Sequence, residues 1–199
     1  MRGSRLSPEK RAKRDAERKA FRAYLRGAQE EPFVLDEDDA YCCGEVIFPS
    51  VLAHLRWPLR GLMVGMVGLL PISTLKVFLY RLLGVKIGRS VYIAPGVVID
   101  PLYPWLVELG DNCFLGMGCK IFTHEYTATQ FRIGRTRVGQ GSVIGGYSIL
   151  RAGVTIGSRV TVGFNSYVNR DVPDGETVGG VPARPLRQNR KTTFRETAD

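Results

Sequence analysis

Only two histidines occur in the 199 residues of this chain, and one of them, His124, lies in the segment KIFTHEYTATQFRIGRTRVG, residues 120–139. An imidazole exchanges a proton near physiological pH, and histidine is the side chain used most often as a general acid or base. The other histidine, His54, lies in an apolar segment, where packing is the simpler role. His124 is therefore the candidate for proton transfer, and the elements around it must both fix and expose it.

Those elements follow from a period of six residues that begins at Val85. Aliphatic anchors recur at this spacing, most are followed by a small residue, and a second small or apolar residue stands four positions after ten of the twelve anchors. A helix does not show this period. It predicts short flat strands that form a stacked coil, with the anchors pointing inward and glycine at the tight corners. The anchors are Ile87, Ile93, Ile99, Leu109, Leu115, Ile121, Val138, Ile144, Leu150, Ile156, Val162 and Val168.

The strings IGRSVYIAPGVVID, LGDNCFLGMGCKI and VGQGSVIGGYSILRAGVTIGSRVTVGFNSYVNRDVPDGETVGGVPARPLR resemble the hexapeptide-repeat acyltransferases. The closest subgroup is that of the maltose, galactoside and capsule-sugar O-acetyltransferases, and RAGVTIG, NRDVP and GGVPARPLR correspond to its signatures. The resemblance covers residues 85–187. It implies a mainly β fold, a left-handed parallel β-helix with three faces, a homotrimer and acetyl-CoA as acyl donor.

Coils of three hexads divide the repeat into four: residues 87–104, 109–126, 138–155 and 156–173. The period is interrupted before Leu109 and again between Glu125 and Val138, where we expect an irregular excursion, and His124 stands at the root of this excursion. Irregular segments on a rigid scaffold are the usual place for binding groups. In the resembled enzymes, a histidine at this root is the general base that takes a proton from an acceptor hydroxyl, which then attacks the thioester of acetyl-CoA directly.

Two carboxylates could orient the second nitrogen of His124. Glu125 is its neighbour in sequence, and Asp100 lies beside Phe122 in the adjacent coil by hexad counting. The sequence does not choose between them. The developing oxyanion needs backbone N–H donors, which Gly145 and Gly146 could supply because they have no side chain.

The phosphates of coenzyme A need cationic partners, and arginine suits them by geometry and fixed charge. Arg170 in NRDVP and the pair Arg184 and Arg187 in PARPLR match basic positions of the family motifs, and Asn169 stands beside Arg170. We expect these four residues to bind the acyl donor.

The four cysteines predict neither a disulfide framework nor a zinc site. Cys113 and Cys119 occupy the second small position of their hexads, so we expect them to fill the core, and Cys42 and Cys43 have no assigned role. A zinc enzyme on the same fold would need three imidazoles per metal, and the chain has two histidines. We therefore expect no metal.

The first 45 residues form a charged, partly helical extension. Ser7, Pro8 and Gly27 predict the start and stop of a helix with Phe21 and Tyr24 on one side. Residues 28–45 contain several acidic residues and no Lys or Arg, and such blocks are usually solvated.

Residues 46–84 are apolar with spaced basic residues, and we expect two helices at about 47–69 and 72–83. Two interpretations remain open and are compatible: this segment caps the hydrophobic end of the β-helix, or it is an interfacial membrane anchor. A membrane span needs about 20 apolar residues, and Pro71 interrupts this shorter run. Residues 188–199 form a polar tail.

The resulting hypothesis is an acetyl-CoA-dependent O-acetyltransferase that acts on a hydroxyl of a sugar, polysaccharide unit or glycolipid. The alternative is a non-catalytic β-helix scaffold. The net charge of +9 also suits nucleic acid, but no pattern of stacking aromatic residues supports that partner. The lack of a secretory signal and the cysteine usage favour a cytoplasmic location, with peripheral contact at the inner membrane face left open.

Overall fold

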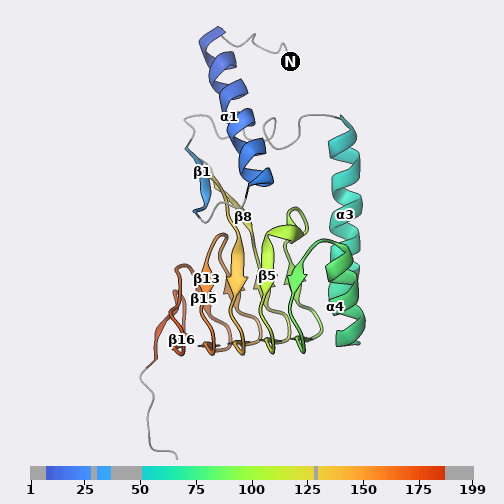
Figure 1. Ribbon diagram of the computed structural model, residues 1–199, viewed down its shortest axis with the longest axis vertical. Coiled ribbons are helices and arrows are strands. Elements are labelled where there is room, and N and C mark those ends of the chain that lie inside the picture. The colour runs from blue at the N-terminus through green and yellow to red at the C-terminus, as the bar shows by residue number, and fades with distance from the viewer. Residues whose placement is uncertain (1–7, 28–30, 37–50, 128–129, 187–199) are drawn as a thin grey trace, which may run out of the picture.

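The computed structural model describes residues 8–27, 31–36, 51–127 and 130–186. Its centre is a stack of coils in which parallel strands form three flat faces, and two helices close one end (Figure 1). The chain passes the three faces in the same order in every coil. This is the parallel β-helix that the six-residue period predicts.

Each face is a sheet made of equivalent strands from successive coils. The first face holds β2 (Lys86–Ile87), β5 (Val107–Leu109), β10 (Thr136–Val138) and β13 (Thr155–Ile156). The second holds β3 (Tyr92–Ile93), β6 (Phe114–Leu115), β11 (Val143–Ile144), β14 (Thr161–Val162), β16 (Thr177–Gly179) and β17 (Arg184–Pro185). The third holds β4 (Val98–Ile99), β7 (Lys120–Ile121), β12 (Ile149–Leu150) and β15 (Tyr167–Val168).

Strand register confirms the predicted phase of the hexads. Anchors of neighbouring coils lie side by side, as Leu109 does with Val138 and Ile121 with Leu150. All the anchors are buried except Ile87, which is partly buried against the same core. The position four residues after the anchor is buried as well, except at Glu125, which follows Ile121 and is partly exposed. Cys113 and Cys119 occupy this position as free thiols, so their role as core residues is confirmed.

The corners show why glycine follows most anchors. A Cβ atom built on Gly116 would lie 2.5 Å from the backbone nitrogen of Gly146 in the next coil. The left-handed backbone that the tight corner requires occurs two residues later, for example at Gly118 (φ 66°) and at Tyr147 (φ 58°). The glycine after the anchor therefore serves close stacking of the coils and not the turn itself, which corrects the expectation from sequence.

A partial fifth coil follows the four predicted ones. Val172 bridges to Ile156 on the first face, and β16 continues the second face beside β14. The chain then reverses, and β17 pairs with β16 in antiparallel direction. The reversal ends the repeat on the second face.

Helices α3 (Val51–Leu69) and α4 (Ser73–Leu82) cover the first coil. Val64, Val67 and Tyr80 are buried in the β-helix core, so the described part of this segment packs on one end of the coils. Predicted residues 47–50 lie outside the described part of the chain. Among the described residues, no helix is long and apolar enough to cross a membrane.

A second, smaller core lies above the coils. Helix α1 (Pro8–Arg26) begins at the predicted Pro8 and packs Phe21 and Tyr24 onto a sheet with the strand order β1–β9–β8 (Figure 1). The strands are β1 (Phe33–Asp36), β8 (His124–Tyr126) and β9 (Gln130–Ile133).

Two expectations are corrected here. The excursion at His124 is a regular antiparallel hairpin, and part of the acidic segment is a strand, because its apolar residues 33–35 pair with β9.

Candidate active site

Asp100 is the buried centre of the candidate site. It follows β4 at the point where the chain leaves the first coil, and its carboxylate is fully buried. One oxygen, Oδ1, accepts backbone hydrogen bonds from Leu102 (2.8 Å) and Tyr103 (3.3 Å). The other, Oδ2, accepts them from Thr123 (2.8 Å) and His124 (3.2 Å). The carboxylate therefore fixes the backbone at the root of the hairpin.

The imidazole of His124 lies directly on this carboxylate. Its Nδ1 is 2.6 Å from Oδ2 of Asp100, and the side chain keeps 22% of its surface exposed. Burial alone would raise the pKa of Asp100, but the hydrogen bond and charge of His124, together with the backbone donors, lower it below its usual value.

The charge of Asp100 determines which ring nitrogen of His124 is basic. An ionised carboxylate only accepts hydrogen bonds, so Nδ1 of His124 must be the donor. The second nitrogen, Nε2, then carries the free lone pair, and no hydrogen bond to it is found within the described residues. The arrangement presents a fixed, partly exposed nitrogen base.

Tyr103 completes the wall beside the base, and it was not among the candidates from sequence. Its ring stands edge-on to His124, with the centroids 5.8 Å apart at 75°. Thr123 Oγ1 donates to the carbonyl oxygen of Tyr103 at 3.4 Å, and Phe21 of α1 packs against the tyrosine ring. The second core therefore holds one side of the imidazole in place.

Glu125 is not the partner of His124. Its carboxylate accepts hydrogen bonds from Arg151 Nε, at 2.9 Å to each oxygen, and from the backbone N–H of Ala152 at 3.2 Å. Glu125 thus ties the hairpin to the third coil, and of the two carboxylates it is Asp100 that contacts the imidazole. Sequence reasoning missed Arg151, although register counting from Ile121 and Leu150 places it beside Phe122, close to the hairpin root.

The glycine pair lies at the opposite end of the third face. Gly145 and Gly146 precede β12, whereas His124 follows β7, and these two strands run parallel side by side. The backbone N–H of Gly145 is already bonded to the carbonyl oxygen of Val162 (2.8 Å), so this residue has no free donor. No hydrogen bond from the N–H of Gly146 is found in the described part of the chain. One chain therefore does not bring the base and this donor together.

The predicted coenzyme-binding residues lie toward the far end of the stack. Asn169 and Arg170 follow β15, on the same edge as His124 and two coils further along. Arg184 lies in β17 on the second face and is exposed, with Nη1 donating to the carbonyl of Ala183. Arg170 lines a hollow together with Ala183 and Pro185, the two neighbours of Arg184 in sequence. Arg187 lies outside the described residues.

The two described cysteines are unsuited to chemistry. Burial raises the pKa of the Cys113 thiol and raises that of Cys119 to about 12, so both are protonated at neutral pH. Within the described ranges, no three His, Cys, Asp or Glu side chains are grouped closely enough to hold a metal ion.

The repeat matches two family models. One describes the bacterial transferase hexapeptide (six repeats) and covers residues 135–170, and the other describes the hexapeptide repeat of succinyl-transferase and covers residues 107–122. The second match ends just before His124, and the first begins just after the hairpin. The models therefore cover the coils on both sides of the candidate base.

Known proteins share more of the chain. YvoF of Bacillus subtilis (strain 168), an acetyltransferase by name, is 36% identical over 115 residues, which cover 57% of this chain and 67% of YvoF. WcaF of Escherichia coli (strain K12), named for colanic acid biosynthesis, is 29% identical over 141 residues, with coverages of 59% and 76%. The solved acetyltransferase of Vibrio cholerae O1 biovar eltor, complexed with acetyl coenzyme A, has a TM-score of 0.56 at 25% identity and covers 69% of this chain and 89% of its own.

These similarities agree with the stack of hexapeptide coils. The fold is a left-handed parallel β-helix preceded by helical segments. The chain belongs to the family of hexapeptide-repeat acetyltransferases.

Proposed function

We propose that this protein is an acetyl-CoA-dependent O-acetyltransferase that acetylates a hydroxyl of a sugar, a polysaccharide unit or a glycolipid. The observation that carries the proposal is the pair of His124 and Asp100, in which Nδ1 is bound to an ionised carboxylate and Nε2 has no hydrogen-bond partner among the described residues. Such a nitrogen suits the removal of a proton from a hydroxyl.

The reaction needs one transfer step and no covalent enzyme intermediate. Nε2 of His124 takes the proton as the hydroxyl oxygen forms a bond to the thioester carbonyl carbon. The carbon–sulfur bond then breaks, and the leaving thiolate receives the proton from the imidazolium. Asp100 stabilises the imidazolium that forms between these steps, as a buried carboxylate does for other histidine bases.

The oxyanion requires a backbone donor, and one chain does not place the Gly145–Gly146 corner near the base. The N–H of Gly146, which has no hydrogen bond among the described residues, is suited to this role, but it lies at the other end of the third face from His124. Side-by-side packing of copies can bring this corner of one chain to the histidine corner of its neighbour. We therefore propose a homotrimer with the sites between subunits.

The free thiols of Cys113 and Cys119 suit a reducing cytoplasm.

The acyl donor is proposed from both the arginines and the comparisons. Arg170 and Arg184 are exposed cations near the end of the stack and suit phosphate groups, and Asn169 and Arg187 complete the proposed set. The similar Vibrio cholerae enzyme is complexed with acetyl coenzyme A. The name of WcaF, which points to colanic acid biosynthesis, supports a glycan acceptor.

The test is an incubation of the purified full chain with acetyl-CoA and a panel of monosaccharides, oligosaccharides and glycolipids. Release of free thiol and a mass gain of one acetyl group on an acceptor are expected. Arg184→Ala should raise the KM for acetyl-CoA, whereas Arg159→Ala, an exposed arginine at another corner, should not. No thiol release with any acceptor, combined with no rise in Tm on addition of coenzyme A, would favour a scaffold instead.

A further inference from the structure

The capping helices are apolar on the side that faces away from the β-helix as well as on the side that packs against it. We call this outward side the outer cap face. Within each helix its large apolar residues recur at spacings of three and four, so they lie on one side of that helix. They are Leu59, Leu62, Met63, Met66, Leu69, Ile72, Leu75, Phe78 and Leu82, and all are exposed. Ile72 stands between the two helices.

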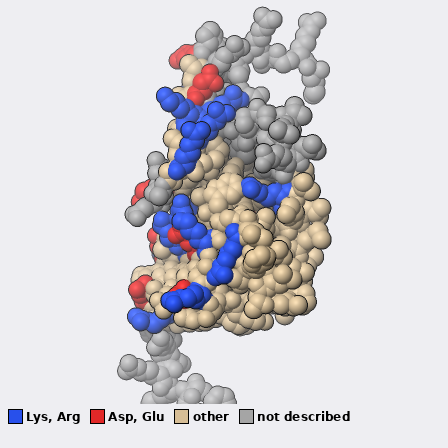
Figure 2. All heavy atoms as spheres, turned by 45° about the vertical axis from the view of Figure 1, so that its right-hand side comes forward, with Lys and Arg blue, Asp and Glu red and all other residues tan. Residues whose placement is uncertain are grey.

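Packing among the described residues does not account for the outer cap face. Val64, Val67 and Tyr80 are buried against the coils, and the partly buried Val77, Leu79 and Leu83 pack against the same core. None of these six residues belongs to the exposed set. A soluble monomer rarely exposes a continuous apolar patch of more than a few hundred Å². Figure 2 shows this broad area of uncharged residues, with Lys and Arg side chains beside it and no Asp or Glu inside it.

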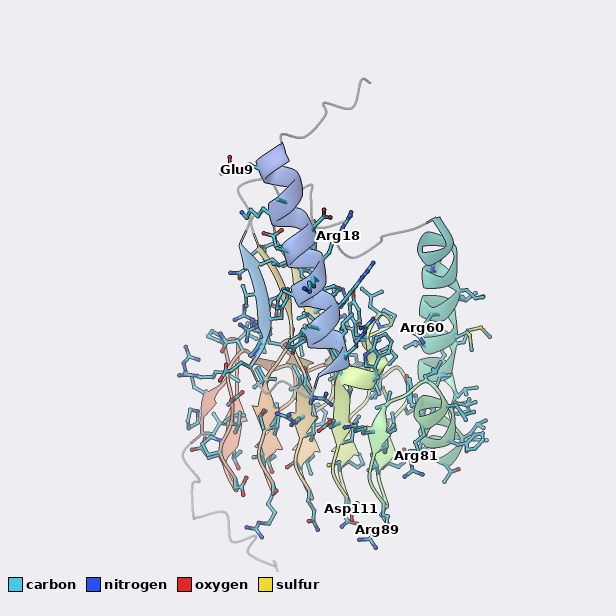
Figure 3. All side chains as sticks on the ribbon, turned by 45° about the horizontal axis from the view of Figure 1, so that its top comes forward. Glu9, Arg18, Arg60, Arg81, Arg89 and Asp111 are labelled. Atoms are coloured by element: carbon cyan, nitrogen blue, oxygen red, sulfur yellow. The ribbon has the colours of Figure 1, made fainter. Side chains whose placement is uncertain are left out.

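The charged residues of the capping segment itself have one sign. Residues 46–99 contain six Lys and Arg residues and no Asp or Glu. Of these six, Lys76 is buried, Lys86 pairs with Glu108, and Arg89 pairs with Asp111. Two arginines border the face on its coil side (Figure 3): Arg60 lies over the ring of Trp105, 4.8 Å from its centroid, and Arg81 donates to the carbonyl oxygens of Ile87 and Gly88. In the described part of the chain, neither is neutralised by a carboxylate. A partner that covers the face should therefore be apolar in its middle and anionic at its edge.

We propose that the outer cap face binds the surface of a membrane that contains anionic lipids. An amphipathic helix with leucine, methionine and phenylalanine on one side inserts that side at the boundary of headgroups and acyl chains, and nearby arginines contact anionic headgroups. Neither helix is long and apolar enough to cross the bilayer, so both lie on it. The apolar middle and cationic edge fit this occupant better than a protein surface of mixed charge.

The position of the face leaves it accessible in an assembly. The helices cover the end of the stack, while the sheets form its sides (Figure 1). Copies that pack side by side through their sheets leave the ends of their stacks open. The competing occupant is a second assembly, whose outer cap face would pack against this one end to end.

Docking would also bring the candidate site close to the bilayer. Asp100 leaves the first coil, which the helices cover, and His124 follows the second, so one coil spacing of about 5 Å separates their strands. The acceptor would then be a sugar hydroxyl of a membrane-bound glycolipid, and this identification of the acceptor rests on the proposed function. The docking itself does not depend on that function.

The test is flotation of the full chain with vesicles of phosphatidylcholine alone and of phosphatidylcholine with 30% phosphatidylglycerol, about a third anionic. Wild-type protein should float with the anionic vesicles and much less with the neutral ones. Leu62→Ser/Met66→Ser should lower the partition coefficient at least about tenfold, since both residues are 62% exposed and therefore available to the lipid. Leu186→Ser, an exposed leucine at the opposite end, is the matched control and should not change it.

Arg81→Gln should reduce binding to anionic vesicles severalfold, and Arg159→Gln at a remote corner should not. Circular dichroism and Tm check that each variant is folded. Equal flotation of wild type and Leu62→Ser/Met66→Ser, or no flotation of wild type, overturns the proposal. Concentration-dependent pairing of assemblies that the double variant abolishes, without flotation, assigns the face to a second copy. Flotation without acetyl transfer would leave the docking intact and overturn only the proposed function.

Discussion

Asp100 and His124 are 24 residues apart in sequence, yet Oδ2 of the carboxylate lies 2.6 Å from Nδ1 of the imidazole. The contact is a product of coil stacking, because Ile99 pairs with Ile121 and brings the ends of β4 and β7 together. The same carboxylate holds the backbone of Thr123 and His124. One buried side chain therefore sets both the position and the tautomer of the proposed base.

Replacement of Asp100 by Asn should lower kcat by about 100-fold or more. The amide nitrogen can donate to Nδ1, which moves the ring proton to Nε2 and removes the base. Steady-state kinetics at saturating acetyl-CoA would measure the loss, and Glu125→Gln is the control, because Glu125 contacts Arg151 rather than the imidazole. A kcat for Asp100→Asn within twofold of wild type would rule out the orienting role.

The lowered pKa of Asp100 makes a prediction for acid stability. A carboxyl group whose pKa is lower in the folded than in the unfolded chain stabilises the fold above the unfolded value of about 3.9, and this contribution is lost as the pH falls through the folded value. The Tm of wild type should therefore exceed that of Asp100→Asn at pH 6, and the difference should shrink below about pH 4. Thermal melts of both proteins from pH 2.5 to 7 measure this difference in Tm. A difference that stays constant over this range would contradict the lowered pKa of Asp100.

The second core should matter for catalysis although it lies outside the coils. Phe21 of α1 packs against Tyr103 and Phe131, and Tyr103 contacts His124. Phe21→Ala should cost about 3–5 kcal/mol of unfolding free energy and reduce kcat, since it removes the cover of the hairpin. Urea titration and kinetics test this. The matched control is Val34→Ala, because Val34 is exposed on β1, and its effect should be within about 0.5 kcal/mol.

Close stacking at the corners can be tested with a pair of glycines. Gly116→Ala would place Cβ 2.5 Å from the nitrogen of Gly146 and 2.8 Å from the carbonyl oxygen of Ile144, so it should destabilise the fold by about 1–3 kcal/mol. Gly65→Ala has no atom within 4 Å and lies inside α3, so it should stabilise by up to about 1 kcal/mol. Denaturant titration measures the free energy of unfolding of both variants. If Gly116→Ala leaves this free energy unchanged, the coils have room to separate at this corner.

Most of the coil architecture could be predicted from sequence because the hexad is a local pattern. A single count from Val85 places the inward anchors, the small residues such as Cys113 and Ser142, and the point where the chain leaves the stack at His124. The same count places Asp100 beside Phe122. The apolar spacing of residues 46–84 likewise gave both capping helices.

The rest depends on contacts between distant segments that no local pattern encodes. Strand β1 lies in a segment dominated by acidic residues, and only its pairing with β9 makes it a strand. The choice between Asp100 and Glu125 depended on where Arg151 lies, because the guanidinium of Arg151 hydrogen-bonds to the carboxylate of Glu125. Tyr103 stands in the interruption of the repeat, where no hexad phase exists to place it. The role of the corner glycines required the distance between neighbouring backbones.

The role of His124 as the base for acetyl transfer is tested most directly by kcat for thiol release from acetyl-CoA, measured for wild type and His124→Ala with the best acceptor. We expect a kcat at least about 100-fold lower for His124→Ala, with the Kd for coenzyme A and the Tm close to those of wild type. An unchanged kcat in the folded variant would contradict it.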